Sequence, residues 1–330
     1  MTKIAIVILN WNGKSLLETF LPSVMVNSQE ADIYVADNNS TDDSVAFVKS
    51  NFPTVHIIKN DDNYGYAIGY NEALKQINAE IYCLLNSDVE VSPNWLTPII
   101  DIFQRDPNTA IIQPKLLDYH NKTLFEYAGA AGGFLDKYGY PYCRGRIFET
   151  IEEDHGQYST NCNIFWASGA CFFIRSKVYK ELNGFDEAYF AHFEEIDLCW
   201  RAFNLGYQTK YIGTSTVYHV GGATLKNIDP KKTYLNFRNS LFTTTKNAKG
   251  NLFLLIVTRL LLDGLAATKF LFEFKFAHFL SILKAHLSYY IHLPKLLKQR
   301  KTFLKKPNYY QIGSIIWAYF INKKKTFNSL

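Results

Sequence analysis

The sequence predicts an α/β protein in which a mainly parallel sheet is flanked by helices. Four short apolar runs in the first hundred residues are typical of buried strands, at 4–9, 33–36, 55–58 and 81–85. Helix-like segments lie between them, at 15–26, 42–51 and 64–77. Such an alternation favours parallel strands, because each helix returns the chain to the same end of the sheet. With 48% hydrophobic residues among 330, the chain can bury a sizeable core without disulfides or structural metals.

Polar clusters follow all four predicted strands. They read "NWN" at 10–12, "DNN" at 37–39, "NDDN" at 60–63 and "NSD" at 86–88. Asn and Asp are common turn residues, and turn chemistry is the alternative explanation. Four such clusters at the same end of successive strands coincide with the edge where open α/β sheets bind ligands. We therefore expect a polar binding site at this edge.

The elements that follow are less regular. Ser40 and Thr41 stand where an N-cap would begin the second helix. Residues 116–157 lose periodicity and gain Gly, Tyr and charge, which predicts a long excursion or lid over the site, outside the core. Beyond it, "GACFFIRSKVYKEL" predicts a strand that enters a helix, and "FEEIDLCWRAFNLGY" has helical spacing with Gly206 at its C-terminal end.

The C-terminal part, residues 246–330, differs in composition from the rest. It holds 15 Lys and Arg against two acidic residues, whereas acidic residues outnumber basic ones in the remainder. Charges interrupt its Leu- and Phe-rich stretch, so we expect no simple transmembrane helix. The pairs Arg259/Asp263 and Lys269/Glu273 are spaced as on a helix surface. Basic amphipathic helices on a membrane and a helical pair packed on the main domain are the alternatives, and the positive charge favours the membrane.

Several classes of protein are disfavoured by what the sequence lacks. No G-x-G-x-x-G follows the first strand and no G-x-x-x-x-G-K-[ST] occurs, which argues against a dinucleotide dehydrogenase and a P-loop kinase or ATPase. Five cysteines without Cys-x-x-Cys spacing predict a reducing compartment with neither disulfides nor a zinc site. The start, "MTKIAIVILNWNG", does not resemble a signal peptide. A bound phosphate would then be neutralised by something other than a glycine-rich loop.

Carboxylates after the fourth strand can supply that neutralisation. Asp88 and Glu90 are two residues apart, so at strand spacing their side chains share one face. Hard oxygen ligands there can hold Mg²⁺ or Mn²⁺ against a diphosphate, with Asp88 the best placed. Glu90 would contribute through water or face solvent. His219, at the end of a β-like run, becomes interesting if it lies beside Asp88.

A second acidic group is Glu194, Glu195 and Asp197, within a predicted helix and among aromatic residues. A carboxyl group in such surroundings has a raised proton affinity, which suits a general base. The alternative is an acidic helix N-terminus favoured by the helix dipole. We expect Asp197 and Arg201, four residues apart, to form a structural pair.

Seven motifs occur in an order that is known. They are "VILNWNG", "VADNNSTDDS", "NYGYAIGYNEAL", "LLNSDVEV", "SGACFFIRS", "GFDEAYFAHFEEIDLCWRAFNLGY" and "YHVGGAT". Over residues 4 to about 224 the chain resembles the family 2 glycosyltransferases with a GT-A fold, particularly the bacterial rhamnosyltransferase-like branch. The resemblance implies a GT-A domain at 1–245, with a nucleotide-sugar half at 1–115 and an acceptor and catalytic half at 116–245. Residues 246–330 would form a basic amphipathic helical region that associates with a membrane.

The resemblance also implies a role for individual residues. "NSD" stands in place of the family's D-x-D motif, so Asp88 would bind Mg²⁺ or Mn²⁺, with His219 completing the site. Asn86 replaces the first Asp of that motif, which leaves the metal held by fewer charges. Glu195 would be the catalytic base, and Glu194 would orient the acceptor. Nucleotide-sugar contacts are implied for Asn10, Asp37, Asn63, Gly65, Asn71 and Ser87, and acceptor contacts for Trp166, Ser168 and Gly169.

The expected function is an inverting, metal-dependent transfer of a sugar from a nucleotide donor to a hydroxyl of a lipid-linked cell-surface glycan. dTDP-rhamnose follows from the branch of the family, and a UDP-hexose is the other candidate donor. We expect a cytoplasmic protein attached to the inner face of the cell membrane, with no nucleic-acid partner. Two alternatives remain: a metal-dependent phosphohydrolase or nucleotidyltransferase, and an inactive sugar-nucleotide-binding partner of a glycan assembly complex.

Overall fold

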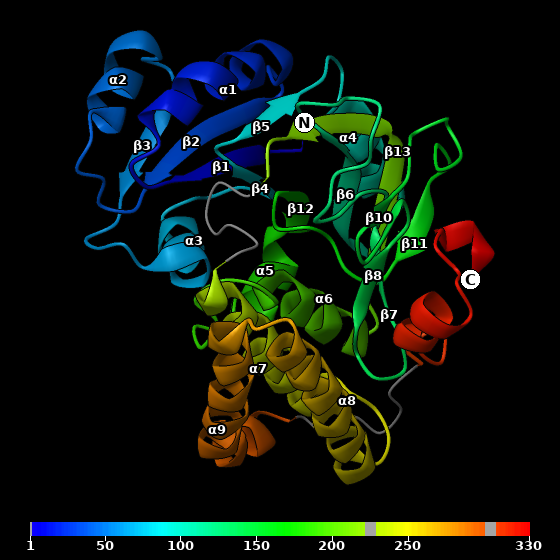
Figure 1. Ribbon diagram of the computed structural model, residues 1–330. Coiled ribbons are helices and arrows are strands. Elements are labelled where there is room, and N and C mark those ends of the chain that lie inside the picture. Colours follow the sequence, from blue (N-terminus) through cyan, green and yellow to red (C-terminus); the bar gives the residue numbers. More distant parts are fainter. Residues whose placement is uncertain (1, 222–228, 301–307) are drawn as a thin grey trace.

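The computed structural model, which describes residues 2–221, 229–300 and 308–330, is built around a nine-stranded mixed sheet (Figure 1). The strand order is β11-β13-β6-β12-β4-β1-β2-β3, and β5 pairs with β13. The first four strands are parallel, as predicted: β1 (Ile4–Asn10), β2 (Ala31–Asp37), β3 (His56–Lys59) and β4 (Ile81–Asn86). β12 (Cys171–Arg175) runs antiparallel between β4 and β6 (Thr109–Asp118). The edge is completed by β13 (Gln208–His219), parallel to β6, with β11 (Cys162–Ile164) and β5 (Val89–Val91) antiparallel to it.

Helices cover both faces of this sheet, so successive side chains along a strand point into two different buried layers. One layer receives α1 (Lys14–Asn27), α2 (Ser44–Asn51) and α4 (Thr97–Arg105); the other receives α3 (Gly65–Lys75), α5 (Ser176–Glu181) and α6 (Glu194–Asn204). Within β1, for example, Val7 belongs to the second layer and Ile6 and Ile8 to the first. This confirms the predicted α/β class. Gly206, at φ 93°, follows the end of α6 as expected.

The predicted N-cap of α2, at Ser40 or Thr41, is wrong by two or three residues. The helix begins at Ser44 and its N-cap position is Asp43, without a side-chain capping bond. The Ser40 hydroxyl instead accepts hydrogen bonds from the Asn10 amide and from the backbone of Asn12, at 3.2 and 2.9 Å. Ser40 therefore ties the ends of β1 and β2 together, and the local pattern could not distinguish this from capping.

Residues 116–157 do not form a lid outside the core. They contain a small antiparallel sheet of β7 (Gly133–Leu135), β8 (Pro141–Cys143), β9 (Arg146–Ile147) and β10 (Thr150–Ile151). Phe125, Leu135 and Ile147 belong to the same buried cluster as the central sheet. The expectation failed because strands of two or three residues are too short to show a period in the sequence.

Three long helices occupy the last third of the chain: α7 (Pro230–Asn247), α8 (Leu252–Phe272) and α9 (Phe276–Gln299). Of these, α8 and α9 lie within the C-terminal part, residues 246–330. Figure 1 shows α8 and α9 side by side below the sheet, and α7 between them and α6. The last residues return to the small sheet with turns at Trp317–Ile321 and Phe327–Ser329, where the rings of Phe327 and Phe134 lie 5.1 Å apart. Among the helices of the described ranges, none combines the length and apolar character that crossing a membrane requires.

One predicted surface pair is buried. Arg259 and Asp263 are each 1% exposed and 4.0 Å apart, whereas Lys269 and Glu273, 3.7 Å apart, lie on the surface as expected. Arg259 donates to the Tyr138 carbonyl at 2.8 Å. The pair therefore joins α8 to the small sheet. The expected boundary between residues 245 and 246 falls inside α7.

Candidate active site

Asp88 and His219 meet at the carboxyl end of the central sheet. Asp88 lies just past β4, and its carbonyl accepts a hydrogen bond from the backbone of Val220 at 3.1 Å. This bond holds the end of β13 beside Asp88, so that Oδ1 of Asp88 lies 3.2 Å from Nε2 of His219. Both side chains are buried, at 4% and 6% exposure. The structure thus brings together the two residues expected at a metal site.

Glu126 completes this cluster and was missed in the sequence. Its Oε1 lies 3.2 Å from Nδ1 of His219, on the opposite side of the ring from Asp88. Burial alone would lower the pKa of His219, but the carboxylates of Glu126 and Asp88 outweigh it and raise the pKa to about 10. An isolated acid inside the small, apolar stretch "LFEYAGAAGG" was the signal that could have found it.

The donor set fits a divalent cation with two protein ligands. Asp88 supplies the carboxylate that Mg²⁺ and Mn²⁺ prefer, and His219 supplies a nitrogen next to it. In residues 2–221, 229–300 and 308–330, no group of three or more His, Cys, Asp or Glu is arranged around a single ion. Substrate oxygens would therefore have to complete the coordination. Asn86, with Nδ2 3.4 Å from Nε2 of His219, adds no charge to the pair.

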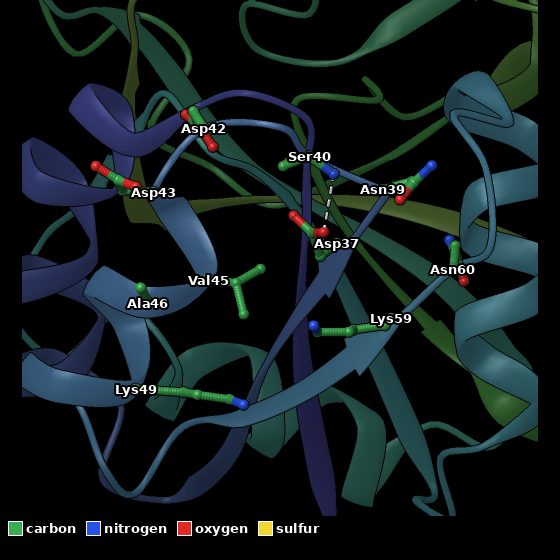
Figure 2. Close-up of a pocket in the computed structure, with 10 residues that line it drawn as sticks. All are labelled: Asp37, Asn39, Ser40, Asp42, Asp43, Val45, Ala46, Lys49, Lys59 and Asn60. Carbon is green, nitrogen blue, oxygen red and sulfur yellow. Dashed lines mark hydrogen bonds between the residues drawn. The ribbon is translucent and has the colours of Figure 1, made fainter.

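Asp37, an expected nucleotide contact, lies at the end of β2. Its carboxylate accepts hydrogen bonds from the Asn10 amide at 3.1 Å and from the backbone of Ser40 at 3.0 Å. Asp37 lines a pocket of about 370 Å³. Lys49 of α2 and Lys59 of β3 also line this pocket (Figure 2). The pocket is polar, and its wall carries both acidic and basic side chains.

The ends of β1 and β4 meet at Gly13. A Cβ on Gly13 would lie 2.5 Å from the Asn10 side-chain oxygen and 3.8 Å from the Ser87 hydroxyl, so a larger residue there would displace the Asn10 amide. Asn63 accepts from the backbone of Gly65 at 3.1 Å, and Gly65 has φ 70°, a conformation that favours glycine. The nucleotide-sugar contacts of Asn10, Asn63, Gly65 and Ser87 stay predictions.

Glu194 and Glu195 begin α6 in apolar surroundings. Burial raises the pKa of Glu194 well above its ordinary value, with the Glu195 charge as the second cause. Burial also raises the pKa of Glu195, to about 7. One oxygen of each carboxyl group, Oε2, is buried without a hydrogen-bond partner in the described part of the chain. Two adjacent carboxyl groups with raised proton affinity are suited to proton transfer near neutral pH.

This acidic pair and the Asp88–His219 pair lie at the same edge of the sheet. A Cβ on Gly169 would lie 3.9 Å from the Glu195 carboxyl carbon, and the Gly169 carbonyl accepts from the Tyr66 hydroxyl at 2.8 Å. The next residue, Ala170, accepts through its carbonyl from the backbone of Asn86 at 2.9 Å. Asp88 follows Asn86 by two residues, just past the end of β4. A short run of backbone therefore joins the candidate base to the candidate metal site.

The model of glycosyl transferase family 2 matches residues 5–182, more than half of the chain. The chain belongs to this family. It is therefore a glycosyltransferase, and the family that the order of motifs suggested is confirmed.

Curated relatives of this family 2 glycosyltransferase carry glycan-synthesis names. An N-acetylglucosaminyl-diphospho-decaprenol L-rhamnosyltransferase of Mycobacterium tuberculosis is 24% identical over 222 residues, which are 62% of this chain and 71% of the relative. The low-salt glycan biosynthesis hexosyltransferase Agl10 of Haloferax volcanii is 23% identical over 283 residues, covering 82% of this chain and 86% of the relative. The first supports the rhamnosyltransferase-like type of the family.

Solved structures confirm the GT-A fold. GalNAc-T7 with UDP, GalNAc and Mn²⁺ superposes with a TM-score of 0.60 at 16% identity, over 74% of this chain and 49% of that one. The mannosyltransferase PcManGT from Pyrobaculum calidifontis, in complex with GDP-Man and Mn²⁺, gives a TM-score of 0.54 at 14% identity, over 91% and 73%. The chain thus spans about half the length of the GalNAc-T7 chain.

Three residues with predicted substrate contacts form hydrogen bonds within this glycosyltransferase. Asn71 donates to the Phe185 carbonyl at 3.0 Å, and its oxygen accepts from the Tyr179 hydroxyl at 2.6 Å. The buried Trp166 donates its indole N–H to the Phe134 carbonyl, and the buried Ser168 accepts from the backbone of Ala170. These contacts hold the walls of the site. The substrate contacts of the three residues stay predictions.

Proposed function

We propose that this glycosyltransferase is an inverting, metal-dependent enzyme that transfers a sugar from dTDP-rhamnose or a UDP-hexose to a hydroxyl of a lipid-linked cell-surface glycan. One observation carries the proposal: a buried, partly unpaired carboxyl pair lies at the same sheet edge as the Asp88–His219 pair. A base and a diphosphate anchor are the two groups that a single displacement at a sugar carbon needs.

Glu195 is the base in this mechanism. Its pKa of about 7 leaves a large share of the carboxyl groups ionised at neutral pH, while its neighbour Glu194 stays protonated more readily. Oε2 of Glu195 takes the proton of the acceptor hydroxyl as that oxygen attacks C1 of the donor sugar. The bond from C1 to the diphosphate oxygen breaks on the opposite face, and its electron pair leaves with the nucleoside diphosphate. A single displacement inverts the configuration at C1.

The donor is held by the polar ends of the first four strands. Asp88 and His219 would bind Mg²⁺ or Mn²⁺, and the bound ion would offset the charge of the diphosphate. Asp37, with Asn10 behind it, would hold the base and ribose. Asn63, Gly65, Asn71 and Ser87 would border the donor, and Glu194, Trp166, Ser168 and Gly169 the acceptor.

The donor and acceptor are proposed from the relatives. The Mycobacterium tuberculosis protein is named as a rhamnosyltransferase that acts on a diphospho-decaprenol carrier, and Agl10 is named as a hexosyltransferase. These two names favour rhamnose or a hexose as the sugar. They also favour an acceptor that is held at a membrane or belongs to a polysaccharide.

Membrane attachment is proposed from the C-terminal helices. Large exposed apolar side chains gather on both helices of the α8–α9 hairpin and at its tip: Phe253, Leu254, Val257, Leu261, Leu265, Leu271, Phe272, Phe274, Phe276, Leu280, Leu283, Leu287, Tyr290, Ile291 and Leu297. Patches of this extent mark interaction surfaces. Exposed Lys269, Lys275, Lys284, Lys295 and Lys298 surround them, against Glu273 as the exposed acid of the hairpin. An anionic bilayer matches both the apolar side chains and the positive charge. We therefore place the protein at the inner face of the cell membrane, with residues 246–330 as the region that associates with it. Residues 1–115 and 116–245 would form the nucleotide-sugar half and the acceptor and catalytic half.

A donor screen tests the function. The purified full-length protein would be mixed with dTDP-rhamnose, UDP-glucose, UDP-galactose or GDP-mannose and Mn²⁺ or Mg²⁺, with and without EDTA. Released nucleoside diphosphate would be measured with and without a membrane glycolipid extract. We expect release from one donor that requires the metal and rises with the extract, and the anomeric configuration of the product, read by NMR, to be inverted.

Other outcomes of this screen would contradict the proposal. Release that is indifferent to the acceptor would indicate a phosphohydrolase. Donor binding by calorimetry without turnover would indicate a sugar-nucleotide-binding partner. Retained configuration would exclude a single displacement and with it the role of Glu195.

A further inference from the structure

The turn that leads into α6 is strained. His192 and Phe193, two consecutive residues that are not glycine, have φ of 68° and 72°. The Cβ atom makes this left-handed region unfavourable, and two such residues in a row persist only where the surroundings hold them. They immediately precede Glu194 and Glu195, and no side-chain hydrogen bond caps α6. The conformation of this turn therefore decides where α6 begins and where its carboxyl groups lie.

Asn239 of α7 is bonded to this turn. Its Nδ2 donates to the carbonyls of Ala191 and His192, at 2.9 and 2.7 Å, and so uses both hydrogens of the amide. Its Oδ1 accepts from Nε of Arg238 at 2.8 Å, which fixes the direction in which the amide faces. Asn239 is completely buried. A buried amide that places both of its hydrogens on one turn, with its oxygen held by Arg238, gives that turn a defined geometry.

The same face of α7 holds the segment before the turn. The bonds are Arg238 to the Ala188 carbonyl at 3.1 Å, Thr243 with the Tyr189 hydroxyl at 2.7 Å, and Lys246 with the Asp186 carboxylate at 2.6 Å. These contacts anchor the segment before the turn, whereas Asn239 bonds to the turn itself, at the carbonyls of Ala191 and His192. Lys246 also pairs with Asp197 within α6 at 2.8 Å, so α7 holds both the segment before the turn and the helix after it.

We propose that Asn239 is a positioning residue for the catalytic base. It holds the left-handed turn at His192 and Phe193, and the turn fixes the start of α6 and the carboxylate of Glu195. The inference rests on the proposed role of Glu195. Asn239 bonds to the backbone of the turn and not to the proposed donor site, so its loss acts on kcat and leaves donor binding unchanged.

The test compares two variants of Asn239 with a control on the same helix. Asn239→Ala removes both bonds, and Asn239→Asp keeps the shape but places a carboxylate against two carbonyls. Using the donor that the wild-type protein turns over in the screen above, we expect kcat to fall by about 100-fold, since small misplacements of a reacting group have effects of this size. The donor KM should stay within about threefold of the wild-type value. Thr243→Val, which removes a bond to the same segment but not to the turn, should retain kcat within about threefold.

A second substitution separates positioning from general stability. Glycine adopts positive φ readily, so His192→Gly should relieve the turn of its need for Asn239. We expect the double variant Asn239→Ala/His192→Gly to regain about tenfold in kcat over Asn239→Ala. A loss of melting temperature in Asn239→Ala with kcat retained, or no gain from glycine, would overturn the inference.

Hydrogen exchange distinguishes a failure of this inference from a failure of the proposed function. The backbone amides of residues 194–197 should exchange about tenfold faster in Asn239→Ala than in Thr243→Val, and His192→Gly should restore their protection. Unchanged exchange would overturn the inference even if the wild-type protein turned over none of the four donors. Faster exchange in an inactive protein would sustain the positioning of α6 and place the failure in the function.

Discussion

The imidazole of His219 lies between two carboxylates, with Nε2 3.2 Å from Asp88 and Nδ1 3.2 Å from Glu126. A metal-binding histidine usually has such a partner on its second nitrogen, which fixes the ring and its tautomer. Here the partner, Glu126, comes from the segment between β6 and β7, so this segment contributes to the candidate metal site from the far side of the histidine.

The first prediction concerns Glu126. We expect Glu126→Gln to raise the Mn²⁺ concentration needed for half-maximal activity by about 10- to 100-fold, because the amide orients the His219 ring less firmly. kcat at saturating Mn²⁺ should change much less. The control is Glu90→Gln, since Glu90 pairs with Lys122 on the surface of the same region. Identical metal titrations for wild type and Glu126→Gln would contradict the role of Glu126.

The second prediction concerns the base. We expect Glu195→Gln to lower kcat by about 10²- to 10⁴-fold, because glutamine keeps the shape of the side chain but takes up no proton. Donor binding by calorimetry should be unchanged. Glu187→Gln, an exposed change in the segment before α6, is the matched control and should be neutral. A Glu195→Gln protein with wild-type turnover would remove Glu195 from the mechanism.

The third prediction is the pH dependence of kcat. Burial raises the pKa of Glu195 to about 7, and the groups around it are Glu194, Tyr66 and Cys199. The base acts only when it has lost its proton, so the rate should fall as the pH drops below about 7, with a limiting slope of about one. Turnover at saturating donor and metal between pH 5.5 and 9 measures this. A flat acid limb down to pH 5.5 would argue against the buried carboxyl as the base.

The strands and most helices could be predicted because their burial leaves a local period. Each of β1 to β4, four to seven residues long, contains a short apolar run and ends at or just before a polar cluster. The site residues Asp88 and His219 could be paired only through the family resemblance, since 131 residues separate them and β13 brings them together. Neither hydrophobic periodicity nor the family resemblance pointed to Glu126. Its partner His219 is 93 residues away, and the sequence around Glu126 shows no hydrophobic period.

Burial of charges in the C-terminal helices was also hidden from local patterns. Arg259 and Asp263 have the same i,i+4 spacing as the exposed pair Lys269 and Glu273 on the same helix. What buries the first pair is the segment around Tyr140, whose hydroxyl donates to Asp263 at 2.9 Å from 123 residues away. A spacing rule describes the two pairs identically, and only the packing partner distinguishes them.

These two pairs give the fourth prediction. Asp263→Ala leaves the buried Arg259 without its carboxylate, and we expect it to lower the free energy of unfolding by about 3–5 kcal/mol. Glu273→Ala breaks an exposed, solvent-screened pair and should change the free energy of unfolding far less. Urea unfolding followed by fluorescence measures both changes. Equal effects would show that Asp263 contributes no more than a surface charge.

The fifth prediction concerns the tip of the α8–α9 hairpin. Deleting residues 246–330 would be a poor test of membrane attachment, because the cut falls inside α7 and removes Lys246, which is bonded to Asp186 and Asp197. Replacing Phe272 and Phe274, which are 82% and 80% exposed, removes apolar surface without touching the core.

We therefore expect Phe272→Ser/Phe274→Ser to lose most binding to vesicles with anionic headgroups, because the two rings no longer enter the bilayer interface. Replacing Lys284 and Lys298 by Gln should weaken binding by about fivefold per lysine, or about 1 kcal/mol each, and the loss should vanish in high salt. The control is Val26→Ser/Leu205→Ser, two exposed apolar residues on other elements. Sedimentation with vesicles would measure all of these, and wild-type sedimentation of the double Phe variant would assign the exposed hairpin to a protein partner instead of a membrane.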